Sequence, residues 1–223
     1  MSAEEVQYVS PSAGMADVAD TRTTANTAII PAEEEEASGV ADTPKDLPQC
    51  FPCVLMKFYV RDCYPDYYDY IIKSMSEGRR YIVVTGTPGI GKSVFYLYFF
   101  EKYKVDCKNK IVVASYSKSR ALKECKIWDP ESKVLQESDV LPKIEGALYL
   151  IDGIPDKEPP ESSWTIIFAS PDITFFIYMN KYGSLFREIY MPNWPLKEIM
   201  EAIEALDLDS SQDVIKKRWM YFG

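Results

Sequence analysis

Residues 81–100 read YIVVTGTPGIGKSVFYLYFF, and this stretch decides the fold. Its first four residues are β-branched or aromatic and predict a short buried strand. A glycine-rich segment follows, and it ends in Gly91, Lys92 and Ser93 with the spacing G-x-x-x-x-G-K-[ST] of a phosphate-binding loop. The apolar run 94–100 predicts a helix that is buried on all sides. Strand, loop and helix in this order favour nucleoside triphosphate binding over a chance match.

The loop residues have separate expected roles. Glycine lets backbone N–H groups approach a polyphosphate closely, which a Cβ would block. Lys92 would reach the β- and γ-phosphates, and the Ser93 hydroxyl would ligate Mg²⁺. The expected nucleotide-binding segment comprises Gly86, Thr87, Pro88, Gly89, Ile90, Gly91, Lys92 and Ser93.

Charge divides the chain of 223 residues into two expected parts. Residues 1–48 contain ten acidic and two basic residues, and they predict a disordered acidic tail. Residues 49–223 carry almost none of the net charge of −9 and are long enough for one domain. No overall basic field therefore indicates a nucleic-acid partner. No apolar run approaches the ~18 residues of a membrane span.

The chain has five cysteines and no histidine. An odd cysteine count does not make a disulfide framework, and it favours an intracellular, reducing compartment. Cys50 and Cys53 have half the spacing of a zinc site, but the sequence lacks the second half. The missing histidine excludes mechanisms that need an imidazole.

The hydrophobic pattern predicts an α/β fold of three layers, with about five mainly parallel strands. After the loop strand, strands are expected at residues 110–116, 147–151, 164–169 and 187–191. Residues 117–145 lack periodicity, and we expect a loop with short helical pieces there. A helix opens near Pro65, and Arg61 before it would form a surface ion pair or contact the nucleotide base or sugar. From about residue 193, two helices would form a lid, with Glu198 on the polar face of the first.

Asp152 is the predicted second anchor of the metal. An apolar strand that ends in Asp about 60 residues after the glycine loop is the Walker B pattern, and this Asp would hold Mg²⁺ directly or through water. An Asp that opens a turn is the alternative. The next residue is Gly153, where many ATPases of this architecture carry a glutamate that orients the attacking water. Nucleotide binding is therefore better supported than fast hydrolysis.

Two further residues are candidates for contact with the terminal phosphate. Ser170 follows the strand at 164–169, on the sheet edge where ligands sit, although a helix cap or turn is equally consistent. Arg187 would stabilise γ-phosphate charge, with an ordinary ion pair as the alternative. The predicted catalytic residues are Lys92, Asp152, Ser170 and Arg187, and the predicted metal ligands are Ser93 and Asp152.

Four segments together resemble a known family. They are FYVRDCYPDYYDYI at 58–71, TGTPGIGKS at 85–93, ASPD at 169–172 and YMPNWPLKEI at 190–199. The chain from residue 51 to 223 resembles the NTPase module of the Crinkler effectors of oomycetes and of related retrotransposon-hot-spot proteins. The resemblance implies an ATPase-like phosphate-loop domain akin to the AAA+ and STAND groups, with ATP and Mg²⁺ as ligands.

The same resemblance implies an effector that is delivered into a host cell, including its nucleus, and that meets a host protein there. Residues 1–48 contain neither a secretory signal nor the Leu-Phe-Leu-Ala-Lys type of translocation motif of such effectors. Family members usually continue past the point at which this chain ends, so truncation at the C-terminus is one interpretation. Self-association and the identity of a protein partner stay open.

Three functional hypotheses follow. The first is an Mg²⁺–ATP-binding module with slow hydrolysis that drives or gates a conformational change. The second is a nucleotide-binding switch or interaction module without turnover, which Gly153 motivates. The third is a nucleotide or small-molecule kinase, which the absence of arginine between Trp194 and Leu208 disfavours.

Overall fold

The computed structural model describes residues 39–50, 56–156, 160, 162–209, 211 and 213–217. The chain divides into two compact units, Met1–Glu36 and Ala37–Gly223, and every described residue belongs to the second unit. The expected disorder of residues 1–38 therefore lies outside the described residues, and so does Cys53 of the half zinc motif.

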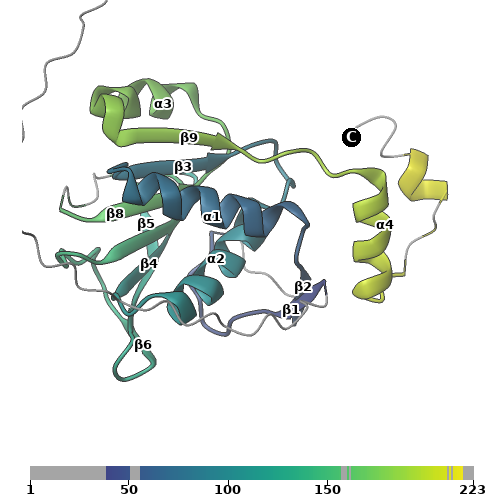
Figure 1. Cartoon of the computed structure of the whole chain (residues 1–223), viewed down its shortest axis with the longest axis horizontal. Helices are drawn as coiled ribbons and strands as arrows, with labels where there is room; N and C mark the ends of the chain where they lie inside the picture. The colour runs from purple at the N-terminus through teal and green to yellow at the C-terminus, as the bar shows by residue number, and fades with distance from the viewer. Residues whose placement is uncertain are drawn as a thin grey trace, which may run out of the picture. The chain divides into compact units, whose positions relative to one another are not determined.

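A seven-stranded sheet forms the centre of the second unit, with its strands in the order β6-β5-β4-β7-β8-β3-β9 (Figure 1). Five neighbouring strands of this sheet, in the order β4-β7-β8-β3-β9, pair in parallel. They are β3 Tyr81–Thr85, β4 Ile111–Tyr116, β7 Leu148–Asp152, β8 Trp164–Phe168 and β9 Phe186–Tyr190. Each lies where the sequence predicts a strand, which confirms the α/β class and the mainly parallel sheet.

Two further strands extend this sheet by antiparallel pairing. They are β5 Leu122–Asp129 and β6 Val134–Glu137. The expectation of a loop with short helical pieces at 117–145 was therefore wrong. The hairpin lies at the sheet edge, and many of its side chains are polar and exposed, so its sequence lacks the continuous apolar run of a central strand.

Helices cover both faces of the sheet (Figure 1). The side chains of Ile82 and Val84 in β3 face α1 (Cys63–Ser76) and α2 (Lys92–Asp106), whereas those of Tyr81 and Val83 join a second core. That second core contains residues of α3 (Ile173–Met179), which a 3₁₀ turn at Asn180–Leu185 continues. The alternation of side chains along each strand thus builds the two layers that flank the sheet.

Five of the seven residues in the predicted apolar run 94–100 of α2 are buried, and the other two, Val94 and Tyr98, are partly buried. Phe95 is fully buried, and its ring contacts Tyr64 of α1 at 5.0 Å and Phe168 of β8 at 5.9 Å between centroids. Aromatic pairs of this kind add about 0.5–1.5 kcal/mol each to the burial of their surface. They fix the first turn of α2 between the sheet and α1.

The folded unit includes part of the predicted tail. Strand β1 Val40–Asp42 pairs antiparallel with β2 Lys57–Tyr59, and Leu47 is buried. The Tyr96 hydroxyl of α2 donates a hydrogen bond of 2.8 Å to the carbonyl of Pro48. Composition assigns residues 39–48 to the acidic tail, but these contacts place them in the folded unit.

Arg61 and Glu198 form a buried ion pair, whereas the sequence predicts a surface ion pair or a nucleotide contact for Arg61 and an exposed helix face for Glu198. Glu198 lies on α4 (Leu196–Ala205), and its side chain accepts two hydrogen bonds of 3.2 Å from Nε of Arg61 and one of 2.9 Å from its NH2 group. Arg61 is 1% exposed and Glu198 is 4% exposed. The expected polar face of α4 therefore contributes one charged residue to the interior, because Arg61 supplies the opposite charge.

The Arg61 guanidinium also reaches three backbone carbonyls. Its NH1 group donates to Ile90 at 3.1 Å and Pro192 at 3.0 Å, and its NH2 group donates to Asn193 at 3.2 Å. The Trp194 ring stacks 4.1 Å from the guanidinium carbon. One side chain thus joins the glycine-rich loop, the segment between β9 and α4, and α4 itself.

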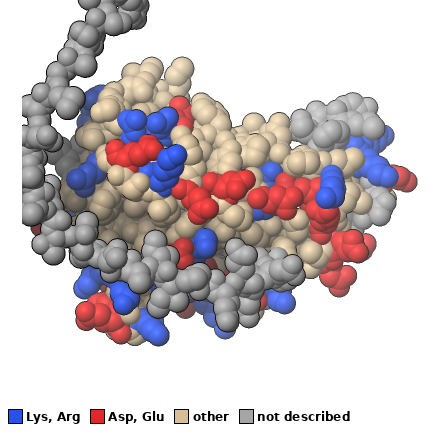
Figure 2. Space-filling model, viewed as in Figure 1, with Lys and Arg blue, Asp and Glu red and all other residues tan. Residues whose placement is uncertain are grey.

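Two surface properties bear on partners. Within the described ranges, none of the helices is both long enough and apolar enough to cross a bilayer. On the face shown in Figure 2, acidic and basic side chains alternate with uncharged surface, and acidic groups occupy the middle of that face.

Removal of Arg61 should destabilise the fold strongly. Arg61→Met leaves the Glu198 carboxylate buried without its partner, and we expect a loss of about 3–5 kcal/mol in the free energy of unfolding. The matched control is Lys197→Met on α4, the helix that carries Glu198. The Lys197 side chain is 85% exposed and pairs with Glu201. This variant should lose less than about 1 kcal/mol.

Urea unfolding of the two variants checks this expectation. The double variant Arg61→Met, Glu198→Leu should recover part of the loss, because no buried charge remains. Equal stability of Arg61→Met and Lys197→Met would contradict the account.

Candidate functional site

The glycine-rich loop between β3 and α2 has a backbone that depends on glycine. Gly91 closes the loop and caps α2 at φ +103°, a region that L side chains rarely adopt. A Cβ at this position would lie 2.8 Å from the Tyr64 hydroxyl oxygen. Both the dihedral angle and the space therefore require glycine where the sequence motif has it.

The outer side of the loop is anchored by hydrogen bonds to its carbonyls. The Ile90 carbonyl accepts from Arg61 and from Nε1 of Trp194, each at 3.1 Å, and the Gly91 carbonyl accepts from the Tyr64 hydroxyl at 3.0 Å. Thr87, Pro88 and Gly89 of the same loop are exposed. Among the described residues, no side chain caps the N-terminus of α2. The first N–H groups of the helix, together with its positive dipole end, can therefore serve an anion.

The Lys92 ammonium curls back over the loop. Its Nζ donates to the carbonyls of Gly86 at 2.8 Å and Thr87 at 3.0 Å. Partial burial lowers the pKa of Lys92, and the nearby Asp152 carboxylate opposes this shift. A bound polyphosphate would offer Nζ a charged acceptor in place of two neutral carbonyls, and such hydrogen bonds are stronger.

Ser93 and Asp152 meet at the carboxyl end of β7. The Ser93 hydroxyl donates to Oδ1 of Asp152 at 3.3 Å, although the two residues are 59 positions apart in the chain. The other carboxylate oxygen accepts from the Cys50 backbone N–H at 2.7 Å. Asp152 is 3% exposed, and this burial raises the pKa of its carboxyl group, against the opposing effect of its hydrogen bonds.

The Ser93 hydroxyl and the Asp152 carboxylate suit Mg²⁺ better than they suit a metal ion whose ligands all come from the protein. The described residues contain no cluster of three or more Asp, Glu, Cys or His side chains that could enclose an ion. Mg²⁺ commonly uses one or two protein ligands and completes its shell with water and substrate phosphates. The hydroxyl of Ser93 and the carboxylate of Asp152 match that donor set.

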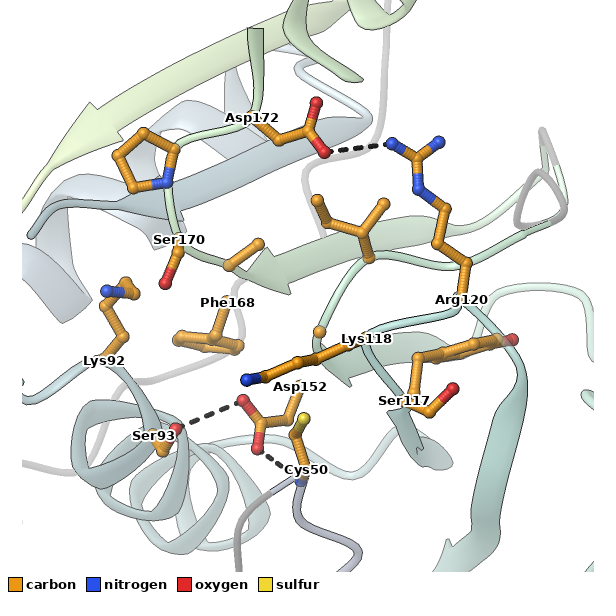
Figure 3. A pocket seen from close by; sticks show the side chains of 15 residues that line it. Cys50, Lys92, Ser93, Ser117, Lys118, Arg120, Asp152, Phe168, Ser170 and Asp172 are labelled. Carbon is orange, nitrogen blue, oxygen red and sulfur yellow. Dashed lines mark hydrogen bonds and ion pairs between the residues drawn. The ribbon is translucent and has the colours of Figure 1, made fainter. Parts of the chain in front are cut away.

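A cleft of about 310 Å³ opens at the carboxyl ends of β4, β7 and β8 (Figure 3). Parallel sheets commonly bind ligands at this edge. Its lining brings together Lys92, Ser93, Asp152 and Ser170, four of the residues that the sequence predicts for the site. The remaining lining residues are Cys50, Tyr116, Ser117, Lys118, Arg120, Gly153, Ile154, Phe168, Ala169, Pro171 and Asp172.

Sequence reasoning missed the basic residues of this cleft. Lys118 and Arg120 lie directly after β4, and Arg120 pairs with Asp172 at 3.0 Å. The sequence could have predicted that Lys118 and Arg120 lie at the cleft. Residues 110–116 were expected to form a parallel strand, and its carboxyl end would lie at the edge of the sheet where ligands bind. The signal was overlooked because the segment after the strand lacked periodicity.

Arg187 is the one predicted catalytic residue that the structure does not bring to this cleft. It is the second residue of β9 and lies opposite Ile82 in the pairing with β3. Tyr190 at the carboxyl end of the strand lies three positions farther along, which is about 10 Å at ~3.3 Å per residue. The position of Arg187 near the amino end of its strand is the reason for this separation.

Gly153 occupies a position that rejects a larger residue. Its φ is +103°, and a Cβ there would lie 2.8 Å from the backbone carbonyl oxygen of Tyr116. A glutamate beside Asp152 would therefore require this backbone to move. Two acidic residues line the described cleft: Asp152, whose carboxylate meets the Ser93 hydroxyl, and Asp172, which is bound to Arg120.

A scan against protein-family models finds no match for this chain, and a search of curated proteins finds none with a similar sequence.

The buried carboxylate predicts a stability that depends on pH. Because burial raises the folded-state pKa of Asp152, its ionised form destabilises the fold in the absence of a cation. Asp152→Asn should therefore have a higher Tm than the wild type at about pH 7 in EDTA. This advantage should shrink as the pH falls toward about 4, where the wild-type carboxyl group becomes protonated.

Thermal unfolding of both proteins across this pH range measures the difference. Asp172→Asn is the control, since its hydrogen bonds lower the pKa of that carboxyl group, so its loss should destabilise the protein at neutral pH. A lower Tm for Asp152→Asn at neutral pH would show that the Asp152 charge is compensated in the free protein.

Proposed function

We propose that the cleft binds a nucleoside triphosphate with Mg²⁺, and that ATP is the natural ligand. One observation carries the proposal. A lysine, a hydroxyl and a buried carboxylate converge beneath the uncapped N-terminus of α2, with Ser93 and Asp152 at 3.3 Å and Lys92 on the same cleft wall. The preference for ATP over other nucleotides rests on the family resemblance alone.

In this proposal the charges of the site complement a polyphosphate. Lys92 exchanges its loop carbonyls for the β- and γ-phosphates, and the N–H groups at the start of α2 contact the same anion. Mg²⁺ would bind Ser93 and Asp152 and would supply the positive charge that the buried carboxylate lacks in the free protein. Ser170 lies two residues after β8 and lines the same cleft, where its hydroxyl would contact the terminal phosphate.

The nucleobase has a candidate groove of about 380 Å³ beside the loop. Val94, which follows Ser93, lines it together with Tyr59 of β2, Trp194 and residues of α4. Almost all of the groove surface is apolar. Such a surface favours the stacking and burial of a flat aromatic base, but it offers few side chains that could read the hydrogen-bonding edge of the base.

Two activities are consistent with this site. Slow hydrolysis of ATP is the first, in which Ser93 and Asp152 would hold the Mg²⁺ that neutralises charge on the phosphates. A nucleotide-gated switch without turnover is the second, and the close contact of Gly153 with Tyr116 favours it, because the usual position of a water-orienting glutamate has no room for one. Phosphate release from ATP separates them: release by the wild type but not by Asp152→Asn supports hydrolysis, and binding without release supports the switch.

Nucleotide binding should stabilise the fold through Lys92. At a ligand concentration of about 100 Kd, Mg²⁺–ATP should add ~2.7 kcal/mol to the free energy of unfolding. For a domain of this size the Tm should rise by about 5–10 °C. Lys92→Ala should remove that rise, because it deletes the principal cation of the phosphate site.

The matched control is Lys102→Ala on the same helix, whose side chain is 40% exposed and lies away from the cleft. It should keep the full rise in Tm with Mg²⁺–ATP. Equal shifts in the wild type and in Lys92→Ala would remove the proposed site, and so would the absence of any shift in the wild type.

A further inference from the structure

The turn between β4 and β5 presents a second lysine to the cleft. Hydrogen bonds between Ser117 and Ala121, and from the Arg120 N–H to the Ser117 carbonyl, fix this turn. Lys118 is exposed and lines the cleft, and Figure 3 shows its side chain extending into it. Arg120 points to the other end of the cleft, where it binds Asp172.

Lys118 and Lys92 approach the cleft from opposite sides of Asp152. In the sheet order, β4 lies on one side of β7, whereas β3 with its glycine-rich loop lies two strands away on the other side. Adjacent strands are ~4.8 Å apart, so the ends of β3 and β4 are about 14 Å apart. A polyphosphate that Lys92 holds at the loop would extend its free end toward β7 and β8, the part of the cleft that the long side chain of Lys118 enters.

Neither Arg120 nor Arg187 is placed to contact the terminal phosphate. Arg120 is engaged with Asp172, and Arg187 lies near the amino end of β9. Phosphoryl transfer generally needs positive charge at the terminal phosphate in addition to the metal ion. Lys118 is the remaining cation that lines the described cleft besides Lys92 and Arg120.

We propose that Lys118 contacts the terminal phosphate and makes the site distinguish a nucleoside triphosphate from a diphosphate. The inference rests on the proposed function, and it assigns Lys118 to the γ-phosphate alone. Lys92 contacts the β-phosphate, which ATP and ADP share, as well as the γ-phosphate. Lys118 serves the phosphate that only the triphosphate has.

Equilibrium dissociation constants for two nucleotides test this assignment. The probes are Mg²⁺–ADP and the Mg²⁺ complex of the non-hydrolysable analogue AMP-PNP, titrated into the full chain. Lys118→Gln should weaken AMP-PNP binding by about tenfold, the effect of losing one hydrogen bond to a charged group, and should change ADP binding by less than about twofold. Lys92→Ala should weaken both ligands.

Lys133→Gln is the control, because Lys133 is an exposed lysine in the turn between β5 and β6 and does not line the cleft. It should bind both nucleotides as the wild type does. Unchanged AMP-PNP binding by Lys118→Gln, or equal weakening of both ligands, would overturn the role of Lys118 and leave the nucleotide site in place. A wild type that binds neither nucleotide would overturn both proposals.

Discussion

The shape of the glycine-rich loop depends on the hydrogen bonds that the Arg61 guanidinium donates. This group binds the Ile90 carbonyl of the loop, two carbonyls of the segment after β9, and the Glu198 carboxylate of α4. A buried cation is tolerated only when its donors are satisfied, so these four partners are held together as a set. The loop therefore has a defined outer wall before any ligand binds, and Arg61 links that wall to α4.

The inner wall of the site has the opposite character, because its charges are incompletely compensated. Asp152 is buried with a raised pKa, and Lys92 has backbone carbonyls of its own loop as its hydrogen-bond acceptors. Both groups would gain from a polyanion and a divalent cation that bind together. Rigid support on one side and unmet charge on the other are the properties expected of a preorganised phosphate site.

The features that could be predicted are mainly those that follow from short stretches of sequence. The loop and α2 follow from glycine positions and a continuous apolar run, and the convergence of Ser93 and Asp152 follows from parallel strands that end at one edge. The Arg61–Glu198 pair could not be predicted, because 137 positions separate its partners and each residue alone resembles a surface charge. The β5–β6 hairpin was missed because edge strands carry polar residues on much of their surface. Arg187 lies on a predicted strand but does not line the cleft, because it stands near the amino end of that strand.

The central claim is that Lys92, Ser93 and Asp152 form one polyphosphate–metal site. Isothermal titration calorimetry of ATP into the chain, with Mg²⁺ and then with EDTA, tests it most directly. The account predicts one site per chain, with binding at least about tenfold weaker without the metal, since the metal links the phosphates to Ser93 and Asp152. Absence of saturable binding at millimolar Mg²⁺–ATP, or an affinity that does not change when the metal is removed, would contradict it.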